Sequence, residues 1–420
     1  MGHRSAGTCI GLERRARVGV AALLIGFALA AAGCASLQAG PRDAVPEKLV
    51  AVAEPVGLND VRIWGDQALT AQQAYQDISE DRLRTRKLSL ARRGAALASN
   101  MLALSGGGDD GAFGAGLMVG WSAHGDRPSF DLVTGVSAGA LIAPFAFLGK
   151  DYDRQLTEVF TRYGGEGIYQ ADLLGGLLGG PAIASNGPLK DLIAKYVDAE
   201  MLRKIAAARG QGRFLLIGTT NIDAQRPVFW DMGKIAASGR PDAIELFRSV
   251  LLASASIPGV FPPVRIRVSA NGRRYDELHV DGGTTREVFF SPAEFSFKDF
   301  DSLLGAPIAR RLFVIRNGKI SPEWQQTEET AVALGERALA TVLKNQAQGD
   351  IERIYQKARR DSIDYNLAGI PASFKVVQHA PFAQAYMQSL FKAAYGLGKA
   401  GYAWAKAPPG APDVADTAAR

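Results

Sequence analysis

The chain has 420 residues, of which 47% are hydrophobic and 21% are charged, and its formal net charge is +6. A chain of this length can bury a large core. The charge is too small to indicate a nucleic-acid-binding protein, so nucleic acid is excluded as the expected partner.

The first 33 residues have the pattern of a signal peptide, with arginines at 14, 15 and 17, an apolar stretch at 18–32 and small residues before Cys34. The segment 31–34 resembles a bacterial lipobox, although Ala31 stands where leucine is usual. The resemblance implies lipidation of Cys34 and anchoring in the cell envelope. Because Ala35 stands in place of aspartate, the resemblance also implies that the protein is sorted to the outer membrane, where it faces the periplasm. Cys9 leaves with the signal, so no intramolecular disulfide is expected. Simple secretion is the alternative.

Residues 34–100 are predicted to be a tether and a helical N-terminal extension. Gly40, Pro41, Pro46 and Pro55 interrupt a stretch without periodicity, which is typical of a linker. The stretch 71–98, rich in Gln, Arg, Leu and Ala, predicts a helix.

The body alternates short apolar strands with helices, which predicts an α/β fold with a mostly parallel central sheet and helices on both faces. The expected strands are 101–104, 130–134, 214–220, 278–280 and 312–315, and the expected helices include 111–121, 138–148 and 242–253. In such sheets the ligand lies beyond the carboxyl ends of the strands.

Ser137 is the candidate nucleophile, because Gly135-Val136-Ser137-Ala138-Gly139 follows an expected strand and precedes an expected helix. This G-x-S-x-G context is typical of a nucleophile elbow. A serine hydroxyl also needs a base and donors for the developing oxyanion.

The loop Gly106-Gly107-Gly108, at the end of the strand 101–104, is the candidate oxyanion hole. Three glycines let peptide N–H groups approach a substrate carbonyl without side-chain obstruction. The longer segment 106–111 also satisfies G-x-G-x-x-G, so nucleotide binding is an alternative. Asp109 and Asp110 would face the pyrophosphate, which disfavours it.

Asp281 is the candidate base, because Asp281-Gly282-Gly283 ends the expected strand 278–280. The histidines outside the signal, His124, His279 and His379, have no context that singles one out. A Ser137–Asp281–His379 triad of the α/β-hydrolase type is the alternative, since these residues occur in the required chain order.

Four motifs in this order resemble the patatin-like phospholipase family: the glycine loop 106–111, the serine motif 135–139, the A-S-x-x-x-P segment 253–258 and the D-G-G segment 281–283. The resemblance covers residues 101–290 and implies a three-layer sandwich. It also implies a lipid acyl hydrolase of the phospholipase A, lysophospholipase or carboxylesterase type.

Carried over to this chain, the resemblance makes Ser137 and Asp281 a catalytic dyad without histidine, metal or cofactor. Gly106, Gly107 and Gly108 become the oxyanion hole, and the substrate is a lipid or ester. Ser254 and Pro258 are expected to shape the turn near the site.

Asp110, preceded by Asp109, departs from the family, in which Arg or Lys is common at this position. Two carboxylates repel an anionic phosphate, so neutral esters or lysolipids are favoured as substrates. A non-catalytic envelope lipoprotein that kept the fold is a further alternative.

Residues 291–407 are predicted to add a strand at 311–317 and helices that pack on the catalytic domain. One helix is expected at 327–360. A second has an apolar face for which core packing is favoured over a bilayer, formed by Phe382, Tyr386, Leu390, Ala394 and Leu397. Residues 408–420 are predicted to be a disordered tail.

Overall fold

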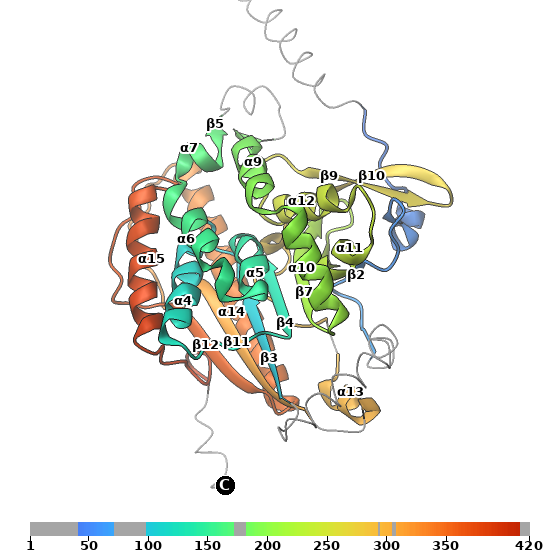
Figure 1. Cartoon of the computed structure of the whole chain (residues 1–420). Coiled ribbons are helices and arrows are strands. Elements are labelled where there is room, and N and C mark those ends of the chain that lie inside the picture. Colours follow the sequence, from blue (N-terminus) through green and yellow to red (C-terminus); the bar gives the residue numbers. More distant parts are fainter. Residues whose placement is uncertain (1–40, 71–97, 172–181, 293–294, 305–307, 412–420) are drawn as a thin grey trace, which may run out of the picture.

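The computed structural model describes residues 41–70, 98–171, 182–292, 295–304 and 308–411. Within these residues the fold is a large sheet with helices on both faces (Figure 1). The expected signal segment, with Cys34, and the helix expected at 71–98 lie outside the described residues, apart from Ala98, which begins a strand.

Five parallel strands form the centre of the sheet, in the order β7, β4, β3, β11, β12. Their bounds are β3 (Ala98–Leu104), β4 (Leu132–Val136), β7 (Phe214–Asn221), β11 (Ala309–Lys319) and β12 (Asp364–Ile370). Ile315 is level with Leu104, Leu104 with Gly135, and Gly135 with Ile217. The loops that leave β3, β4 and β7 therefore start at the same edge of the sheet.

Antiparallel strands extend the sheet beyond β7. β10 and β8 both pair with β7, β9 pairs with β10, and two short strands pair with β9 and β8. Their bounds are β1 (Glu54–Pro55), β2 (Arg62–Trp64), β8 (Arg226–Asp231), β9 (Val264–Ala270) and β10 (Arg273–Asp281). A separate two-strand ribbon pairs β5 (Gln170–Ala171) with β6 (Ala184–Ser185).

Successive residues of β3 point to opposite faces, as the period of a strand requires. Leu102 and Leu104 belong to the larger core, whereas Met101 and Ala103 belong to the smaller one. The larger core is covered by α4 (Gly111–His124), α5 (Ala138–Leu148), α6 (Asp153–Arg162), α7 (Gly165–Ile168), α9 (Gly187–Tyr196), α10 (Ala199–Gly210), α11 (Met232–Ala237), α12 (Ala243–Ser254) and α15 (Gln384–Lys399). The smaller core is covered by α13 (Phe297–Leu304) and α14 (Ala331–Arg360). The expected three layers are confirmed.

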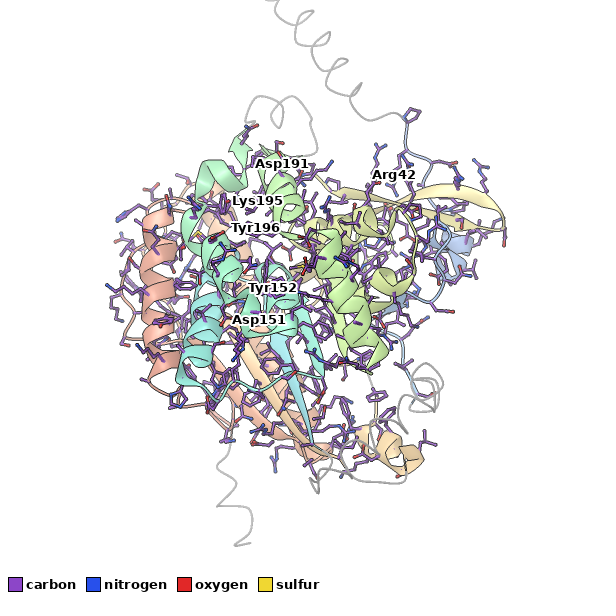
Figure 2. The ribbon with its side chains drawn as sticks, in the orientation of Figure 1. Arg42, Asp151, Tyr152, Asp191, Lys195 and Tyr196 are labelled. Carbon is purple, nitrogen blue, oxygen red and sulfur yellow. The ribbon has the colours of Figure 1, made fainter. Side chains whose placement is uncertain are left out.

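Polar contacts join α6 and α9 on the outer surface, above the residues that these helices bury. Lys195 donates a hydrogen bond to the Tyr163 hydroxyl at 2.6 Å, and the Tyr196 hydroxyl donates to Glu158 at 3.0 Å. Figure 2 shows Lys195 and Tyr196 side by side on this surface. These contacts hold together two helices that both contribute to a pocket described below.

Residues 41–70 pack against the sheet, so the prediction of a tether is wrong for this part of the chain. A short 3-10 helix, η2 (Glu47–Val52), precedes β1, and Ala53, Val61 and Trp64 are buried. The strands β1 and β2 have two and three residues, which is too short for a sequence pattern to indicate them.

Two other boundaries differ from those expected. The strand expected at 130–134 lies two residues later, at Leu132–Val136. At the other end of the chain, Pro408 is buried, and Ala407 and Ala411 pack against the smaller core, so ordered packing continues past residue 407. Among the described helices, none combines the length and apolar character needed to cross a membrane.

Candidate active site

Ser137 lies between β4 and α5 in a strained conformation, with φ 53° and ψ −124°. A positive φ is uncommon for a residue with a side chain and is typical of a nucleophile elbow. Its carbonyl accepts hydrogen bonds from the N–H groups of Ala140 and Leu141, at 2.9 and 3.3 Å, which begins α5. The side chain is only 6% exposed. The strand, sharp turn and helix expected around the serine are therefore present.

Asp281 ends β10 and is 5% exposed. Burial raises the pKa of this carboxyl to about 7; hydrogen bonding with Ser137 opposes the shift, the negative charge of Glu287 adds to it, and the N–H of Gly283 opposes it. The Gly283 N–H donates to Oδ1 at 2.7 Å. A carboxyl with this pKa can exchange a proton near neutral pH, which an ordinary aspartate does poorly.

The Ser137 hydroxyl is close enough to Asp281 to lower the pKa of its carboxyl. Among the described residues, however, the second carboxylate oxygen, Oδ2, has no hydrogen bond of ordinary geometry. Catalytic hydrogen bonds are often loose before substrate binds and tighten afterwards. Oδ2 is thus the oxygen left available to receive a proton.

The segment Ser254–Ser256 holds both candidate residues in place. The Ser254 hydroxyl accepts the backbone N–H of Ser137 at 3.0 Å and donates to the carbonyl of Gly218 at 2.6 Å. The carbonyl of Ser256 accepts the N–H of Asp281 at 2.8 Å. Ser254 therefore has the structural role expected for it, and the N–H of Ser137 is not free to bind an oxyanion.

The glycine loop follows β3 and reaches Ser137 from the neighbouring strand. The N–H of Gly106 donates to the carbonyl of Glu287 at 3.0 Å. This corrects the expectation that Gly106 is one of the oxyanion donors, because its N–H is already bonded. In the described part of the chain, no acceptor is recorded for the N–H groups of Gly107 and Gly108.

Gly107 cannot be replaced by a residue with a side chain. Its φ is 154°, and a Cβ there would lie 2.0 Å from the carbonyl oxygen of Asn317. The loop therefore needs glycine at this position to lie this close to the backbone of β11.

Arg316 and Asn317, on β11, hold the glycine loop in place through hydrogen bonds. Arg316 donates to Glu287 at 2.9 Å, to the carbonyl of Gly106 at 3.0 Å and to the hydroxyl of Ser105 at 3.1 Å. Asn317 donates through its side chain to the carbonyl of Ser105 at 2.7 Å and accepts the N–H of Gly114 at 3.0 Å.

The strand pattern at 311–317 gives no indication of the role of Arg316 and Asn317, and no sequence motif singles out Glu287. Burial raises the pKa of Glu287, and Arg316 opposes this shift. The signal that could have found Arg316 and Asn317 was the presence of polar residues at the carboxyl end of the expected strand 311–317.

Asp109 and Asp110 do not point freely at a ligand; they bind the C-terminal part of the chain. Asp109 accepts the N–H of Phe382 at 3.0 Å, and its other partner is the Gln378 side chain. Asp110 accepts the hydroxyl of Tyr386, on α15, at 2.5 Å. Burial raises the pKa of Asp110 to about 7, although the Tyr386 hydrogen bond opposes this. The repulsion expected against a phosphate is therefore weaker than two free carboxylates would give.

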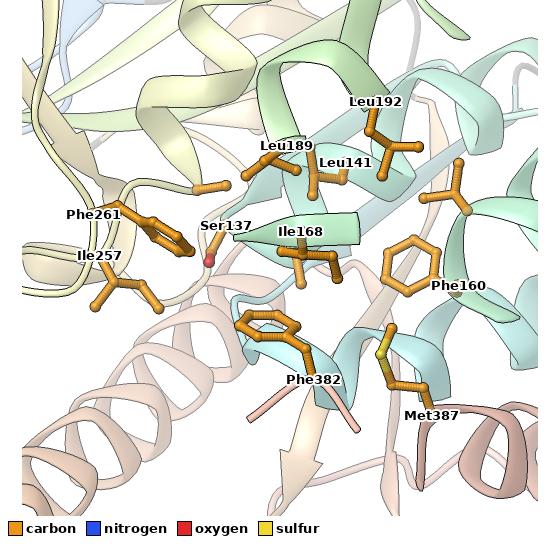
Figure 3. A pocket seen from close by; sticks show the side chains of 14 residues that line it. Ser137, Leu141, Phe160, Ile168, Leu189, Leu192, Ile257, Phe261, Phe382 and Met387 are labelled. Carbon is orange, nitrogen blue, oxygen red and sulfur yellow. The ribbon is translucent and has the colours of Figure 1, made fainter. Parts of the chain in front are cut away.

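Two cavities meet at Ser137. The first is narrow, about 40 Å³, and almost entirely apolar (Figure 3). Besides Ser137 and Gly108, it is lined by Ala138, Leu141, Val159, Phe160, Ile168, Leu189, Leu192, Ala255, Ile257, Phe261, Phe382 and Met387. Phe382 has a strained φ of 53° and closes the pocket opposite Ser137 in Figure 3.

The second cavity is wide, about 710 Å³, and mixed in character. Ser137 and Asp281 both line it, as do Gly107 and Gly108. Charges of both signs surround it, contributed by Asp110, Glu287, Glu323, Arg316, Lys319, Arg337 and Lys344. An ester bound at Ser137 would thus have an apolar slot on one side and a wide chamber of mixed character, with charged groups in its wall, on the other.

The described histidines, His124, His279 and His379, form no recorded hydrogen bond with Ser137 or Asp281. His124 and His379 are exposed, and neither lines the two cavities. His279 is buried two residues before Asp281 but contacts Thr219 at 2.9 Å and Glu277 at 2.9 Å.

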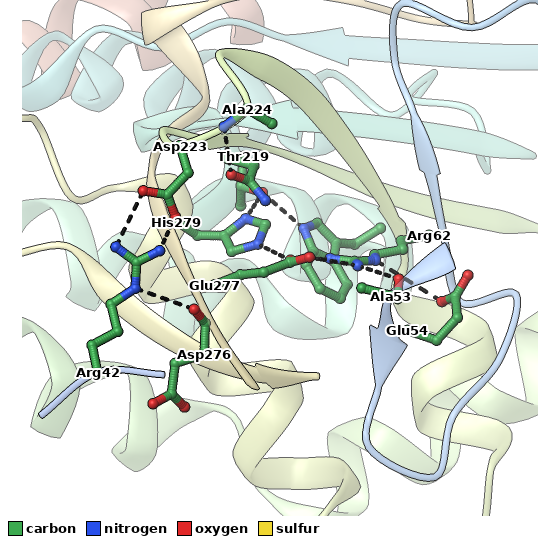
Figure 4. A network of polar contacts seen from close by, with 12 residues as sticks. Arg42, Ala53, Glu54, Arg62, Thr219, Asp223, Ala224, Asp276, Glu277 and His279 are labelled. Carbon is green, nitrogen blue, oxygen red and sulfur yellow. Dashed lines mark hydrogen bonds and ion pairs between the residues drawn. The ribbon is translucent and has the colours of Figure 1, made fainter. Parts of the chain in front are cut away.

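Figure 4 shows His279 in a polar network that runs through Glu277 to Arg62 and from Arg62 to Glu54. Arg62 donates to Glu277 at 2.5 and 3.0 Å and to the carbonyl of Ala53 at 2.7 Å. Burial raises the pKa of Glu277, but its hydrogen bonds with His279 and Arg62 outweigh burial and lower that pKa to about 2. The network ties the N-terminal segment to β10.

Comparison with known proteins gives a family match and distant similarity to solved structures. The family model described as patatin-like phospholipase matches residues 102–293. No curated protein matches the chain. The crystal structure of VipD from Legionella pneumophila is 12% identical, with a TM-score of 0.31, over 73% of this chain and 68% of that one. The residues matched by the family model include the glycine loop, Ser137 and Asp281, so this part of the chain is similar to the patatin-like phospholipases, a family of lipid acyl hydrolases.

Proposed function

We propose that the chain hydrolyses fatty-acyl esters of lipids through Ser137 and Asp281, with a covalent acyl-enzyme intermediate. The observation that carries the proposal is the position of Ser137. It lies beside a buried carboxyl with a pKa of about 7, at the point where an apolar pocket meets a wide cavity with charged groups in its wall. An acyl ester has the matching shape, with an apolar chain on one side of its carbonyl and a polar alcohol on the other.

In this reaction Asp281 takes the proton of the Ser137 hydroxyl while the serine oxygen bonds to the ester carbonyl carbon. The negative charge that forms on the carbonyl oxygen is stabilised by the N–H groups of Gly107 and Gly108. The carbon–oxygen bond of the ester breaks, and the departing alcohol takes the proton from Asp281. Water then gives a proton to Asp281 and attacks the acyl-enzyme, which releases the fatty acid and returns the proton to Ser137.

The cavities limit the choice of substrate. The narrow pocket, about 40 Å³, holds only a short acyl segment as it stands, so a long chain requires Phe382 or Met387 to shift. The wide cavity carries balanced charges, which favours a neutral or zwitterionic leaving group over a strongly anionic one.

The test is ester hydrolysis by purified variants. We expect Ser137→Ala to lower kcat by roughly 10³-fold or more and Asp281→Asn by roughly 10²-fold or more, because these side chains supply the nucleophile and the base. Activity is measured on a short-chain p-nitrophenyl ester, and fatty-acid release from a membrane lipid extract identifies the lipid products. Only protein with Ser137 should react with a fluorophosphonate probe.

Matched controls are Ser122→Ala, in the last turn of α4, and Asp151→Asn on the surface, both of which should keep wild-type activity. Full activity of Ser137→Ala would exclude the dyad. A wild-type protein with neither hydrolysis nor probe labelling would favour the non-catalytic lipoprotein alternative.

We further propose that Cys34 carries the lipid anchor and that the protein is bound to the outer membrane of a bacterial envelope, facing the periplasm. The support is the sequence pattern of residues 14–35. Incorporation of a labelled fatty acid by the wild type, but not by Cys34→Ser, is the expected result. Equal labelling of both would contradict it.

A further inference from the structure

The first half of α14 exposes an apolar stripe. Its members recur every three or four residues and lie on one side of the helix: Ala331, Leu334, Gly335, Ala338, Leu339 and Val342. Leu334 is 53% exposed and Val342 is 60% exposed. In a globular protein a stripe of this kind normally packs against another element, as the second half of α14 does against the smaller core.

Trp324, in the segment before α14, is 88% exposed and lies between Glu323 and Gln325, which both contact Arg337 of that helix. The segment is held firmly, because Arg337 donates to the carbonyl of Glu323 at 2.5 Å and Lys344 donates to the carbonyl of Ser321 at 2.6 Å. The exposure of Trp324 is therefore not explained by a loosely held segment.

The stripe continues into the wall of the wide cavity that ends at Ser137, because Leu339 and Val342 line that cavity. Other exposed apolar side chains belong to segments bound near the same opening. Val376 and Val377 directly precede Gln378, which binds Asp109 in the glycine loop, and the N–H of Ile183 donates to the carbonyl of Gly259.

Seven of the eleven large apolar side chains that are exposed in the described part of the chain belong to this group: Ile183, Trp324, Leu334, Leu339, Val342, Val376 and Val377. We call these seven the apolar rim. Their concentration around one opening points to a function at that opening.

The charges beside the rim do not favour an anionic surface. The segment from Lys319 to Lys344 has three basic residues, Lys319, Arg337 and Lys344, and four acidic ones, Glu323, Glu328, Glu329 and Glu336. Attraction to acidic lipid head groups is therefore weak, and binding would depend on the burial of apolar surface.

We propose that the apolar rim docks on the surface of zwitterionic lipid, with Trp324 and Leu334 inserted among the lipids, so that an acyl ester enters the wide cavity directly. This inference rests on the proposed lipid hydrolysis. A lipid surface is the occupant that fits, because whatever covers the rim also covers the cavity mouth. A lipid there delivers substrate, whereas a protein would block it. Tryptophan is also the residue most typical of a membrane interface.

The first test measures insertion without catalysis. Full-length protein with Ser137→Ala and Cys34→Ser is mixed with vesicles of brominated phosphatidylcholine, which quench tryptophan fluorescence on contact. Trp64, Trp121 and Trp230 are buried, and Trp404 is half-buried against Trp121 and Phe313, so most of the quenching should come from Trp324 and be lost in a Trp324→Phe variant. Absence of quenching, or quenching unchanged by Trp324→Phe, would overturn the proposal.

The second test separates docking from chemistry. We expect Trp324→Ser/Leu334→Ser to hydrolyse phosphatidylcholine vesicles at least about tenfold more slowly while its kcat/KM on a soluble p-nitrophenyl ester stays unchanged, because neither residue lines a cavity at Ser137. The matched control is Val52→Ser/Leu303→Ser, two exposed apolar residues remote from the rim in sequence. It should keep both activities.

Equal loss on both substrates would contradict docking, as would equal loss in the control variant. If the wild type hydrolyses neither substrate, the proposed function fails, whereas the quenching result still decides the docking. A dimer in solution that dissociates on Trp324→Ser/Leu334→Ser, without quenching by vesicles, would assign the rim to a second copy of the chain instead.

Discussion

In the proposed reaction Asp281 serves as a base without histidine, because burial in the fold changes the energy of its charged form. Burial and the nearby Glu287 charge both disfavour the carboxylate, and the pKa rises from an ordinary 3.8 to about 7. Arg316 neutralises Glu287 at 2.9 Å, which limits that repulsion. The ion pair of Arg316 and Glu287 therefore positions Gly106 and also modulates the pKa of Asp281, which burial raises most.

This pKa predicts how activity depends on pH. The carboxylate form of Asp281 accepts the serine proton, so kcat/KM should rise with pH through about 7, following one deprotonation, and then level off. Asp110 has a similar pKa, and Asp110→Asn removes its titration while keeping a group of the same shape. The pH dependence of soluble-ester hydrolysis should therefore be unchanged in the Asp110→Asn variant.

A pH profile that disappears in Asp110→Asn would assign the titration to Asp110 instead of Asp281.

The pH dependence of stability gives an independent check, because stability should fall with pH where activity rises. Both carboxyls bind a proton more tightly in the folded chain than in the unfolded one, so their contribution to the free energy of unfolding should fall as pH rises from about 4 to about 7. Asp110→Asn should reduce that slope.

At the scale of elements, the contact between α4 and α15 connects the glycine loop to the narrow pocket. α4 begins directly after the loop, and α15 carries Tyr386 and Met387. The helices approach closely at glycines, since a Cβ on Gly116 would lie 2.3 Å from the carbonyl oxygen of Phe391 and a Cβ on Gly120 would lie 2.3 Å from that of Tyr395.

Gly120→Ala should therefore push α15 outward. We expect a loss of about 1–3 kcal/mol in the free energy of unfolding, because an added methyl group overpacks the contact. Ester hydrolysis should fall too, because Tyr386 and Met387 move with α15. Urea unfolding and soluble-ester kinetics measure the two effects.

Gly396→Ala is the matched control, since a Cβ at Gly396 of α15 meets nothing within 4 Å. This change should leave activity intact and stabilise the helix by about 0.5–1 kcal/mol, as alanine favours helix more than glycine does. Equal destabilisation by the two substitutions would show that close packing is not the cause.

For the whole molecule, the prediction succeeded where the signal was local. The central strands were recognised as short apolar runs, and the glycine loop, Ser137 and Asp281 were found because each follows or ends such a strand. Other strands were missed. β9 was missed although its residues alternate between exposed and buried, whereas β1 and β2 are too short to have a pattern.

Contacts between distant segments could not be predicted in this way. Arg62 forms a buried ion pair with Glu277, 215 residues later, and this pair fixes residues expected to be a tether. Gly106 was expected to be an oxyanion donor, but the carbonyl of Glu287, far along the chain, takes its N–H. A single sequence has no local pattern that records which distant group will occupy a donor.

The meeting of two unlike cavities at Ser137 also sets the order of events in the proposed reaction. The alcohol departs into the wide chamber, and the water that completes the cycle arrives through that same chamber, while the apolar pocket keeps the acyl chain attached to the serine. The two products therefore leave by different routes and at different times. Any second alcohol that fills the wide chamber competes with water for the acyl group, so the contents of that chamber decide between hydrolysis and acyl transfer.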